Sequence, residues 1–173
     1  AAHGTAPARS VLPALERVPR QADMPISHTQ QRLWFLRQMD PTSHAYNIAA
    51  SLRITGPLDE AVLERVLAVL VARHESLRTR FISVQGEPRF VIDPNARVHL
   101  DRIDISHLQG PARDAACKQA IESIARRPFD LSQAPLIHAG LIREASQQQV
   151  FTFALDHIVS DGLSLGIFML EFR

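Results

Sequence analysis

The chain has 173 residues, of which 46% are hydrophobic and 21% are charged, as is typical of one globular domain with its own core. Its formal net charge of +1 gives no general attraction to nucleic acid or acidic membranes, and no basic stripe is present. Cys117 is the only cysteine, which excludes an intrachain disulfide and a cluster of thiolate metal ligands.

Residues 1–25 are predicted to form a linker or N-terminal arm. Four prolines interrupt any helix in this segment, at Pro7, Pro13, Pro19 and Pro25. The segment also lacks the apolar core of a signal peptide, and no apolar run elsewhere is long enough to cross a bilayer. We therefore expect a cytoplasmic protein in which this arm either follows another domain or is a disordered terminus.

The first half of the remaining chain predicts two helices and a strand. Residues 29–39 contain neither Gly nor Pro and follow Ser27, a suitable N-cap, so they predict a helix. The alternation of apolar and polar residues over 45–56 predicts a strand. A second helix is predicted over 59–74. Its apolar face is assigned to Val62, Val66, Val69 and Leu70.

The second half predicts strands that pair as hairpins. Two strands are joined at 85–87, and a short strand lies near 98–105. A helix over 111–126 precedes two apolar strands over 135–144 and 149–157. A last helix over 162–172 carries the apolar positions Leu163, Gly166, Ile167 and Leu170. The predicted fold class is α+β (mixed α/β), a mixed β-sheet with one layer of flanking helices.

The last predicted strand ends at a histidine. A period of two places Phe151, Phe153, Leu155 and His157 on one face of the strand, and Asp156 on the other. A side chain at the end of a rigid strand, beside an open loop, is well placed for a functional role. Taken alone, however, His157 is more simply interpreted as a hydrogen-bonded polar residue at a strand end.

The residues after this histidine predict a turn and the start of a helix. Asp161 is either the N-cap of that helix or the partner of an arginine in a buried ion pair. Gly162 allows close backbone approach, or simply serves the turn. A metal site formed by Asp156, His157 and Asp161 is disfavoured, because adjacent strand residues diverge and no second histidine is suitably placed.

Several motifs resemble the condensation domains of nonribosomal peptide synthetases. Three of them occur in the order found in that family: ISHTQQRLWFL at 26–36, RHESLRTRF at 73–81 and DHIVSDG at 156–162. AYNIAASLRITGPLD at 45–59 and RPFDLSQAPLIHAGLIR at 127–143 are also similar to the family. The resemblance therefore extends over almost the whole chain after the predicted linker.

The resemblance implies a fold like that of chloramphenicol acetyltransferase, in which two similar lobes enclose a tunnel. Residues 26–173 would be the N-terminal lobe, inactive without the C-terminal lobe. Family members form a peptide bond between a donor acyl thioester and an acceptor aminoacyl thioester. Both substrates hang from peptidyl carrier proteins by 4′-phosphopantetheine arms, and an adenylation domain is the usual neighbour. No cofactor or metal of the domain itself, and no nucleic-acid or membrane partner, is implied.

The family signature is two histidines, three variable residues and Asp-Gly. By this resemblance His157 is the catalytic histidine, acting as a general base or as a residue that positions the amine. Asp161 is the structural aspartate, for which Arg78 is the first candidate partner and Arg73 the second. The Gly162 amide is a possible donor to the oxyanion. In the first motif, Trp34 and Arg32 are expected to be structural, with Trp34 packed in the core.

The chain departs from the signature at Asp156, which stands where the family has its first histidine. Either acyl transfer is retained, or the added carboxylate stabilises the imidazolium and weakens His157 as a base. Asp156, Asp161 and Ser164 also match the D-x4-D-x2-S pattern of heterocyclisation domains, although the motif at 26–36 is of the condensing type. A non-catalytic module that binds carrier proteins is the remaining alternative.

Overall fold

Two β-sheets organise the part of the chain that this computed structural model describes, residues 19 and 21–172. Their strand orders are β1-β4-β3 and β2-β7-β6-β5. The strands are β1 (Met24–Pro25), β2 (Asn47–Thr55), β3 (Thr79–Val84), β4 (Glu87–Ile92), β5 (Leu100–Asp104), β6 (Ile137–Ala145) and β7 (Gln148–Asp156). Strands β5 and β6 are parallel and every other neighbouring pair is antiparallel. The predicted mixed sheet is present, but a second, smaller sheet accompanies it.

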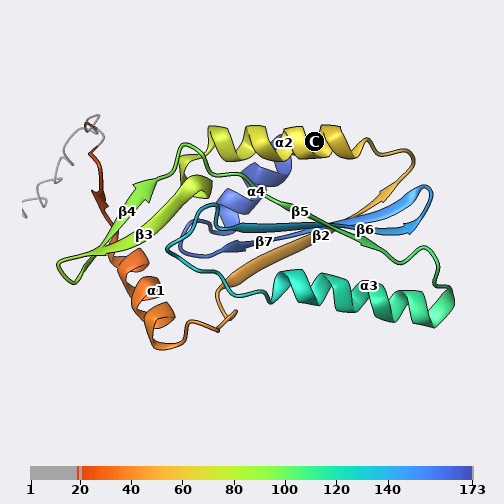
Figure 1. The fold of residues 1–173 in the computed structure, drawn as a ribbon, viewed down its shortest axis with the longest axis horizontal. Coiled ribbons are helices and arrows are strands. Elements are labelled where there is room, and N and C mark those ends of the chain that lie inside the picture. Colours follow the sequence, from red (N-terminus) through yellow and green to blue (C-terminus); the bar gives the residue numbers. More distant parts are fainter. Residues whose placement is uncertain (1–18, 20, 173) are drawn as a thin grey trace, which may run out of the picture.

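Four α-helices and one 3₁₀ helix surround the sheets (Figure 1). They are α1 (His28–Met39), α2 (Glu60–Arg73), η1 (Glu75–Arg78), α3 (Gly110–Ala125) and α4 (Gly162–Glu171). Figure 1 shows α2 and α3 on opposite sides of the four-stranded sheet, with α1 below the small sheet. None of the helices in the described part is long and apolar enough to span a membrane.

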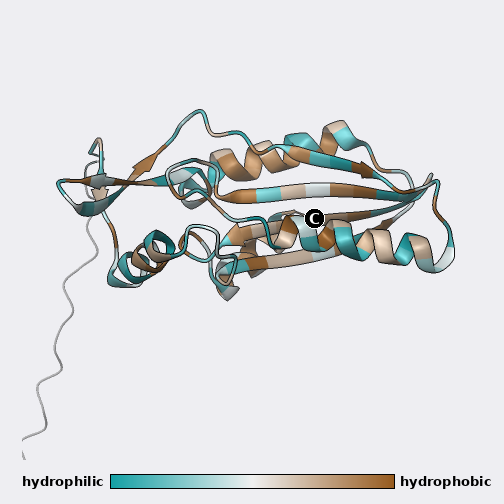
Figure 2. Ribbon diagram, turned by 60° about the horizontal axis from the view of Figure 1, so that its bottom comes forward, coloured by the Kyte–Doolittle hydropathy of each residue, from teal (hydrophilic) through white to brown (hydrophobic). Residues whose placement is uncertain are grey.

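Helices cover both faces of the four-stranded sheet, so the expected single layer of helices was wrong. The reason lies in β7, which is apolar on both faces. Phe151 and Phe153 belong to one buried cluster, whereas Val150 and Ala154 belong to two others on the opposite side. Both faces therefore need an apolar cover. In Figure 2 the central strands are largely brown or pale, while the helices alternate between brown and teal.

The largest cluster lies under α2 and α4, and it corrects two predicted helix faces. The buried residues of α2 are Leu63, Leu67, Leu70 and Val71. Val62 and Val69, which were assigned to the buried face, are 42% and 62% exposed. In α4, Phe168 points into the cluster, whereas the predicted stripe is exposed at Leu163, Ile167 and Leu170. The core side of α2 is thus formed by three leucines and Val71, and that of α4 by Phe168.

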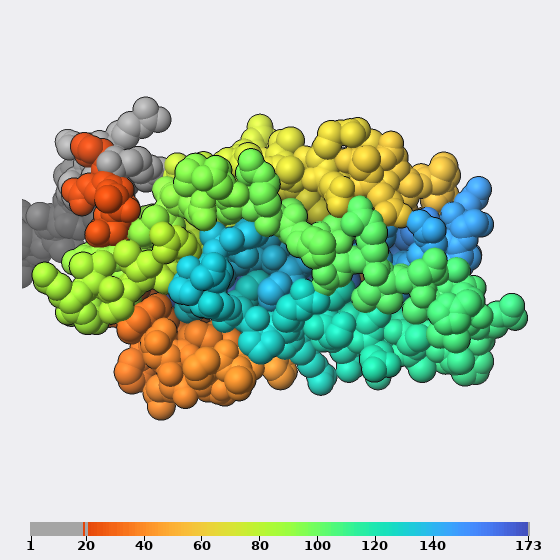
Figure 3. Space-filling view, viewed as in Figure 1, coloured from red at the N-terminus to blue at the C-terminus, as the bar shows by residue number. Residues whose placement is uncertain are grey.

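The other face of the sheet is covered by α3, which presents an apolar stripe to the strands. Cys117, Ala120 and Ile124 are all buried. Ile124 packs so closely over β6 that a Cβ on Gly140 would lie 2.1 Å from its Cδ1 atom. The space-filling view shows the same order of layers, with the central strands enclosed between α2 above and α3 below (Figure 3).

Local sequence signals explain most element boundaries. Ser27 caps α1, and Gln30 completes a capping box by accepting from the backbone N–H of Ser27. The β3–β4 turn uses Gln85 and Gly86, both with positive φ. The expected linker ends sooner than predicted, because Met24 and Pro25 form a short strand against β4. Residues 1–18 and 20 of that linker lie outside the described part.

The corrected face of α2 can be tested with two alanine substitutions. We expect Leu67→Ala to lower the free energy of unfolding by about 2–5 kcal/mol, because Leu67 is 1% exposed in the largest cluster. Val69→Ala is the matched control on the same helix and should change it by less than about 0.5 kcal/mol. Urea denaturation measures both. A larger loss for Val69→Ala would contradict the assigned face.

Candidate active site

His157 begins the turn that follows β7. The backbone of this turn is fixed by the sheet, because the His157 N–H donates to the Tyr46 carbonyl O at 2.9 Å, just beyond the β2–β7 ladder. From Gln149 to Ser160, a segment described throughout, His157 is the one exposed residue. A rigid apolar strand therefore ends in a single imidazole that is open to solvent. His157 is therefore not enclosed in the interior of the described part.

The turn itself is held by hydrogen bonds to Asp156. The carboxylate Oδ1 accepts from the Ile158 N–H at 2.9 Å. The Asp156 carbonyl O accepts from the Val159 N–H at 3.1 Å and from the Ser160 hydroxyl at 3.0 Å. Ile158 and Val159 pack into the cluster between β7, β3 and α1. These contacts fix the backbone on both sides of His157.

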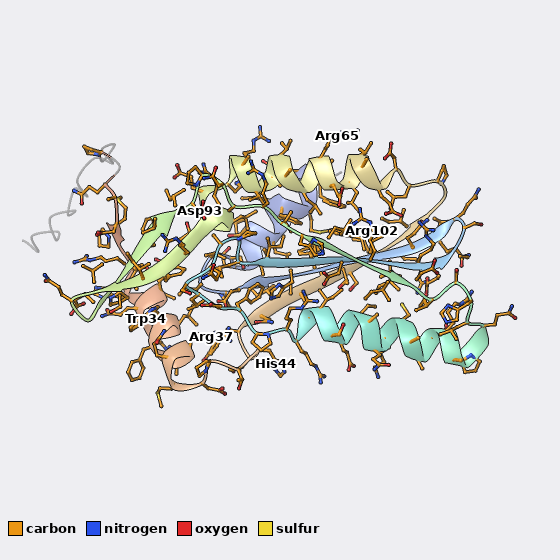
Figure 4. All side chains as sticks on the ribbon, in the orientation of Figure 1. Trp34, Arg37, His44, Arg65, Asp93 and Arg102 are labelled. Carbon is orange, nitrogen blue, oxygen red and sulfur yellow. The ribbon has the colours of Figure 1, made fainter. Side chains whose placement is uncertain are left out.

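The Asp156 carboxylate forms a buried ion pair with Arg37 of α1. Its Oδ2 atom lies 2.7 Å from Arg37 Nη2, and the two side chains are 3% and 7% exposed. Figure 4 shows Arg37 on the side of α1 that faces the four-stranded sheet. As predicted from the strand period, Asp156 lies on the opposite side of β7 from Phe153 and Leu155. Its negative charge is therefore matched by a guanidinium inside the protein.

Asp161 serves as the N-cap of α4, one of its two predicted roles. Its Oδ1 atom accepts from the Ser164 N–H at 2.8 Å and from the Ser164 hydroxyl at 2.6 Å. These two hydrogen bonds, the hydroxyl first, lower the pKa of the Asp161 carboxyl below its ordinary value. Gly162 follows as the first residue of α4, exposed and with open space where a Cβ would lie. Its first-turn amide is free of the intrahelical pattern, as N-terminal helix amides are.

The expected ion pair between Asp161 and an arginine is absent among the described residues. Arg73 lies near the other end of α4, where its Nη1 atom is 3.4 Å from Glu171 Oε1. Arg78 instead leads into the small sheet, where its carbonyl O accepts from the Asp93 N–H, and its Nε atom is buried without a hydrogen-bond partner. The pairing with Arg78 or Arg73 was therefore wrong for this structure. The cause is that Ser164 satisfies Asp161 locally.

Trp34 packs beside the turn as expected. It is half-buried against the cluster that contains Ile158 and Val159. Trp34 and Arg37 also line a hollow of about 650 Å³ between α1, β3 and residues 128–132. A smaller hollow of about 110 Å³ lies between η1 and α4, and Ser160 and Ser164 are in its wall. His157 lines neither hollow, so the larger hollow is not the site of the candidate catalytic histidine.

The two acids shared by the disfavoured metal site and by the heterocyclisation pattern, Asp156 and Asp161, already have side-chain partners. Asp156 is paired with Arg37, and Asp161 is occupied by Ser164. Among the described residues, no group of three or more His, Cys, Asp and Glu side chains could hold a metal ion. No geometry at the turn therefore favours either interpretation.

The family is decided by comparison with known proteins. The sequence pattern of the family described as Condensation domain matches residues 20–173. The chain belongs to the condensation domain family. The family match thus covers every element of the fold, including α1, the His157 turn and α4.

Relatives of this condensation domain are nonribosomal peptide synthetases. A linear gramicidin synthase of Brevibacillus parabrevis is 46% identical over 156 residues, which are 90% of this chain and 3% of that protein. Chondramide synthase cmdD of Chondromyces crocatus is 40% identical over 156 residues, 90% of this chain and 4% of that protein. Phosphinothricin tripeptide synthetase PhsC of Streptomyces viridochromogenes is 38% identical over 154 residues, which are 87% of this chain and 14% of that protein. The chain thus spans only a small share of these relatives.

Solved condensation domains confirm the predicted α+β, chloramphenicol acetyltransferase-like fold. The first condensation domain of the calcium-dependent antibiotic synthetase, in complex with substrate analogue 2a, has a TM-score of 0.77 and 26% identity. The starter condensation domain of rhizomide synthetase RzmA has a TM-score of 0.79 and 24% identity, and this likeness shows the fold alone. In each case the match covers 88% of this chain and 36% of the solved chain.

The cap at Asp161 predicts how acid affects α4. Because the folded pKa of Asp161 is lowered, its contribution to stability is present above the unfolded pKa and is lost as the pH falls through the folded one. We expect the stability difference between wild type and Asp161→Ala to shrink on acidification to about pH 2. The difference between Asp161→Asn, which caps without titrating, and Asp161→Ala should stay constant. Denaturation curves at several pH values measure both, and a wild-type difference that does not change would contradict the cap.

Proposed function

We propose that this chain is the N-terminal lobe of a peptide-bond-forming condensation domain in which His157 is the catalytic residue. The observation that carries the proposal is the single exposed imidazole on a turn whose neighbours are all buried and hydrogen-bonded. A group that meets two substrates must be both accessible and rigidly placed. The family membership supplies the reaction class.

The chemistry proposed for His157 is proton transfer or alignment at the attacking amine. The acceptor nitrogen attacks the carbonyl carbon of the donor thioester, the C–S bond breaks, and the new C–N bond forms. The imidazole takes the proton from the nitrogen or holds the nitrogen in line, and the proton ends on the departing thiolate. Because a thioester is already activated, the reaction needs no protein nucleophile. Cys117 is unsuited to that role, since burial raises the pKa of its thiol.

The buried pair at Asp156 supports retained activity in spite of the altered signature. A free carboxylate beside His157 would favour the imidazolium. Here the carboxylate is bonded to the Arg37 guanidinium and to the Ile158 N–H, on the buried side of the turn. The Asp156 carboxylate is therefore less able to stabilise the imidazolium form of His157.

The proposed partners follow from the reaction and from the share of the solved domains that the chain spans. They are the donor and acceptor peptidyl carrier proteins, the C-terminal lobe of the same condensation domain and a neighbouring adenylation domain. The 4′-phosphopantetheine arms belong to the carriers and serve as substrate tethers, so the lobe needs no cofactor of its own. A cytoplasmic setting, where the aminoacyl thioesters are made, is part of this proposal.

The central test is His157→Ala in the complete condensation domain with loaded donor and acceptor carriers. We expect the rate of product formation to fall about 100-fold or more, because general acid–base groups contribute that much. His99→Ala is the control, since the His99 side chain is 84% exposed at the surface. Mass spectrometry of the product measures both rates and detects the additional water loss that ring closure would cause.

Three outcomes of this test would count against the proposal. Equal product from wild type and His157→Ala would remove His157 from the mechanism. Binding of a phosphopantetheinylated carrier without any product would favour the non-catalytic module. A product lacking a further water molecule would favour heterocyclisation.

A further inference from the structure

Helix α1 contacts the His157 turn through two polar side chains that lie seven residues apart. Arg37 pairs with Asp156 at 2.7 Å, and its second terminal nitrogen donates to the Ser43 carbonyl O. Two helical turns earlier, Gln30 Nε2 donates to the Ile158 carbonyl O at 3.1 Å. The two contacts lie on either side of His157 in the sequence. Helix α1 is thus bonded to the turn both before and after the imidazole.

The contacts of Arg37 form a closed circuit that runs through the backbone of His157. The guanidinium bonds Asp156 with one nitrogen and the Ser43 carbonyl with the other. Three residues after Ser43, the Tyr46 carbonyl O accepts from the His157 N–H. Asp156, which precedes His157, is therefore bonded directly to Arg37. Tyr46, which accepts from the His157 N–H, is connected to Arg37 through the short segment 43–46.

Burial makes this circuit sensitive to the loss of one partner. Asp156 uses Oδ2 for Arg37 and Oδ1 for the Ile158 N–H, so one carboxylate joins helix α1 to the turn. Both members of the ion pair are more than nine-tenths buried. A buried charge that loses its partner is strongly unfavourable, and the chain rearranges or takes up a proton to avoid it.

We propose that Arg37 is a positioning residue for the condensation reaction and acts with Asp156 as one unit in place of the first signature histidine. The inference rests on the proposed function of His157. In this chain the acid at 156 is useful because α1 supplies the matching cation. The unit holds the turn at the geometry in which the imidazole meets the substrate amine.

The test compares three variants of the complete condensation domain with loaded carriers. Arg37→Met leaves Asp156 buried and unpaired. Arg37→Met/Asp156→Asn removes both charges but keeps an oxygen that can accept from the Ile158 N–H. Arg53→Met is the matched control, because it leaves the buried Glu144 carboxylate, 4% exposed, without its arginine near the opposite end of β7.

We expect the double variant to regain the melting temperature that Arg37→Met loses, since no buried charge is left unpaired. Its product-forming rate at saturating carriers should nevertheless stay at least about tenfold below wild type, because a small misplacement of a catalytic group lowers the rate by such factors. The carrier KM should be unchanged. Arg53→Met should lower the melting temperature and leave the rate within about twofold of wild type.

A rate that recovers together with the melting temperature would show that the pair only stabilises the fold, and would overturn the proposal. So would a defect confined to KM, or an equal loss of rate in Arg53→Met. Amide hydrogen exchange at His157 gives a readout that needs no catalysis. It should be faster in the double variant than in wild type, and unchanged exchange would overturn the inference even if the wild-type domain proved inactive.

Asp156→His tests the same inference from the other side, because it restores the family signature. If the acid and Arg37 are one unit, this change leaves a buried guanidinium without its carboxylate. We expect the rate to fall at least about tenfold. A rate equal to or above that of wild type would show that Arg37 does not depend on the acid, and would overturn the proposal.

Discussion

Strand β7 lies between β2 and β6, bonded on both sides and buried on both faces from Gln149 to its end. The position of the His157 turn depends on this constraint. A strand enclosed in this way has little freedom to shift, so the turn that follows its last residue begins at a fixed position on the surface. The Tyr46 carbonyl takes up the His157 N–H just beyond the ladder. The imidazole thus emerges at a point set by the whole sheet.

The elements of the fold were largely predictable because their local signals are strong. Ser27 and Asp161 are caps, Gln85-Gly86 is a turn, and the alternation along β2 is regular. The buried faces of α2 and α4 were harder to predict. In these helices apolar residues occur almost all round, so periodicity alone does not select the side that meets Phe151 and Phe153.

The candidate site was predictable in part. His157 and its exposed position follow from the end of an apolar strand together with the resemblance of the motifs. The partner of Asp156 was missed, although a signal existed. Arg37 falls one turn after Leu33 on the inner face of α1, and an arginine in a buried stripe requires an acid. Which acid it meets depends on how α1 sits on the sheet, and that is a tertiary contact with no trace in local spacing.

The separation of Arg37 and Asp156 along the chain has a consequence for building chimeric synthetases. Their ion pair joins segments that are 119 residues apart in sequence. A crossover placed anywhere between them would combine the α1 of one parent with the signature loop of another. If the signature loop of the second parent begins with histidine, the hybrid has a buried arginine at position 37 without an acidic partner. Residues 37 and 156 should therefore come from the same parent.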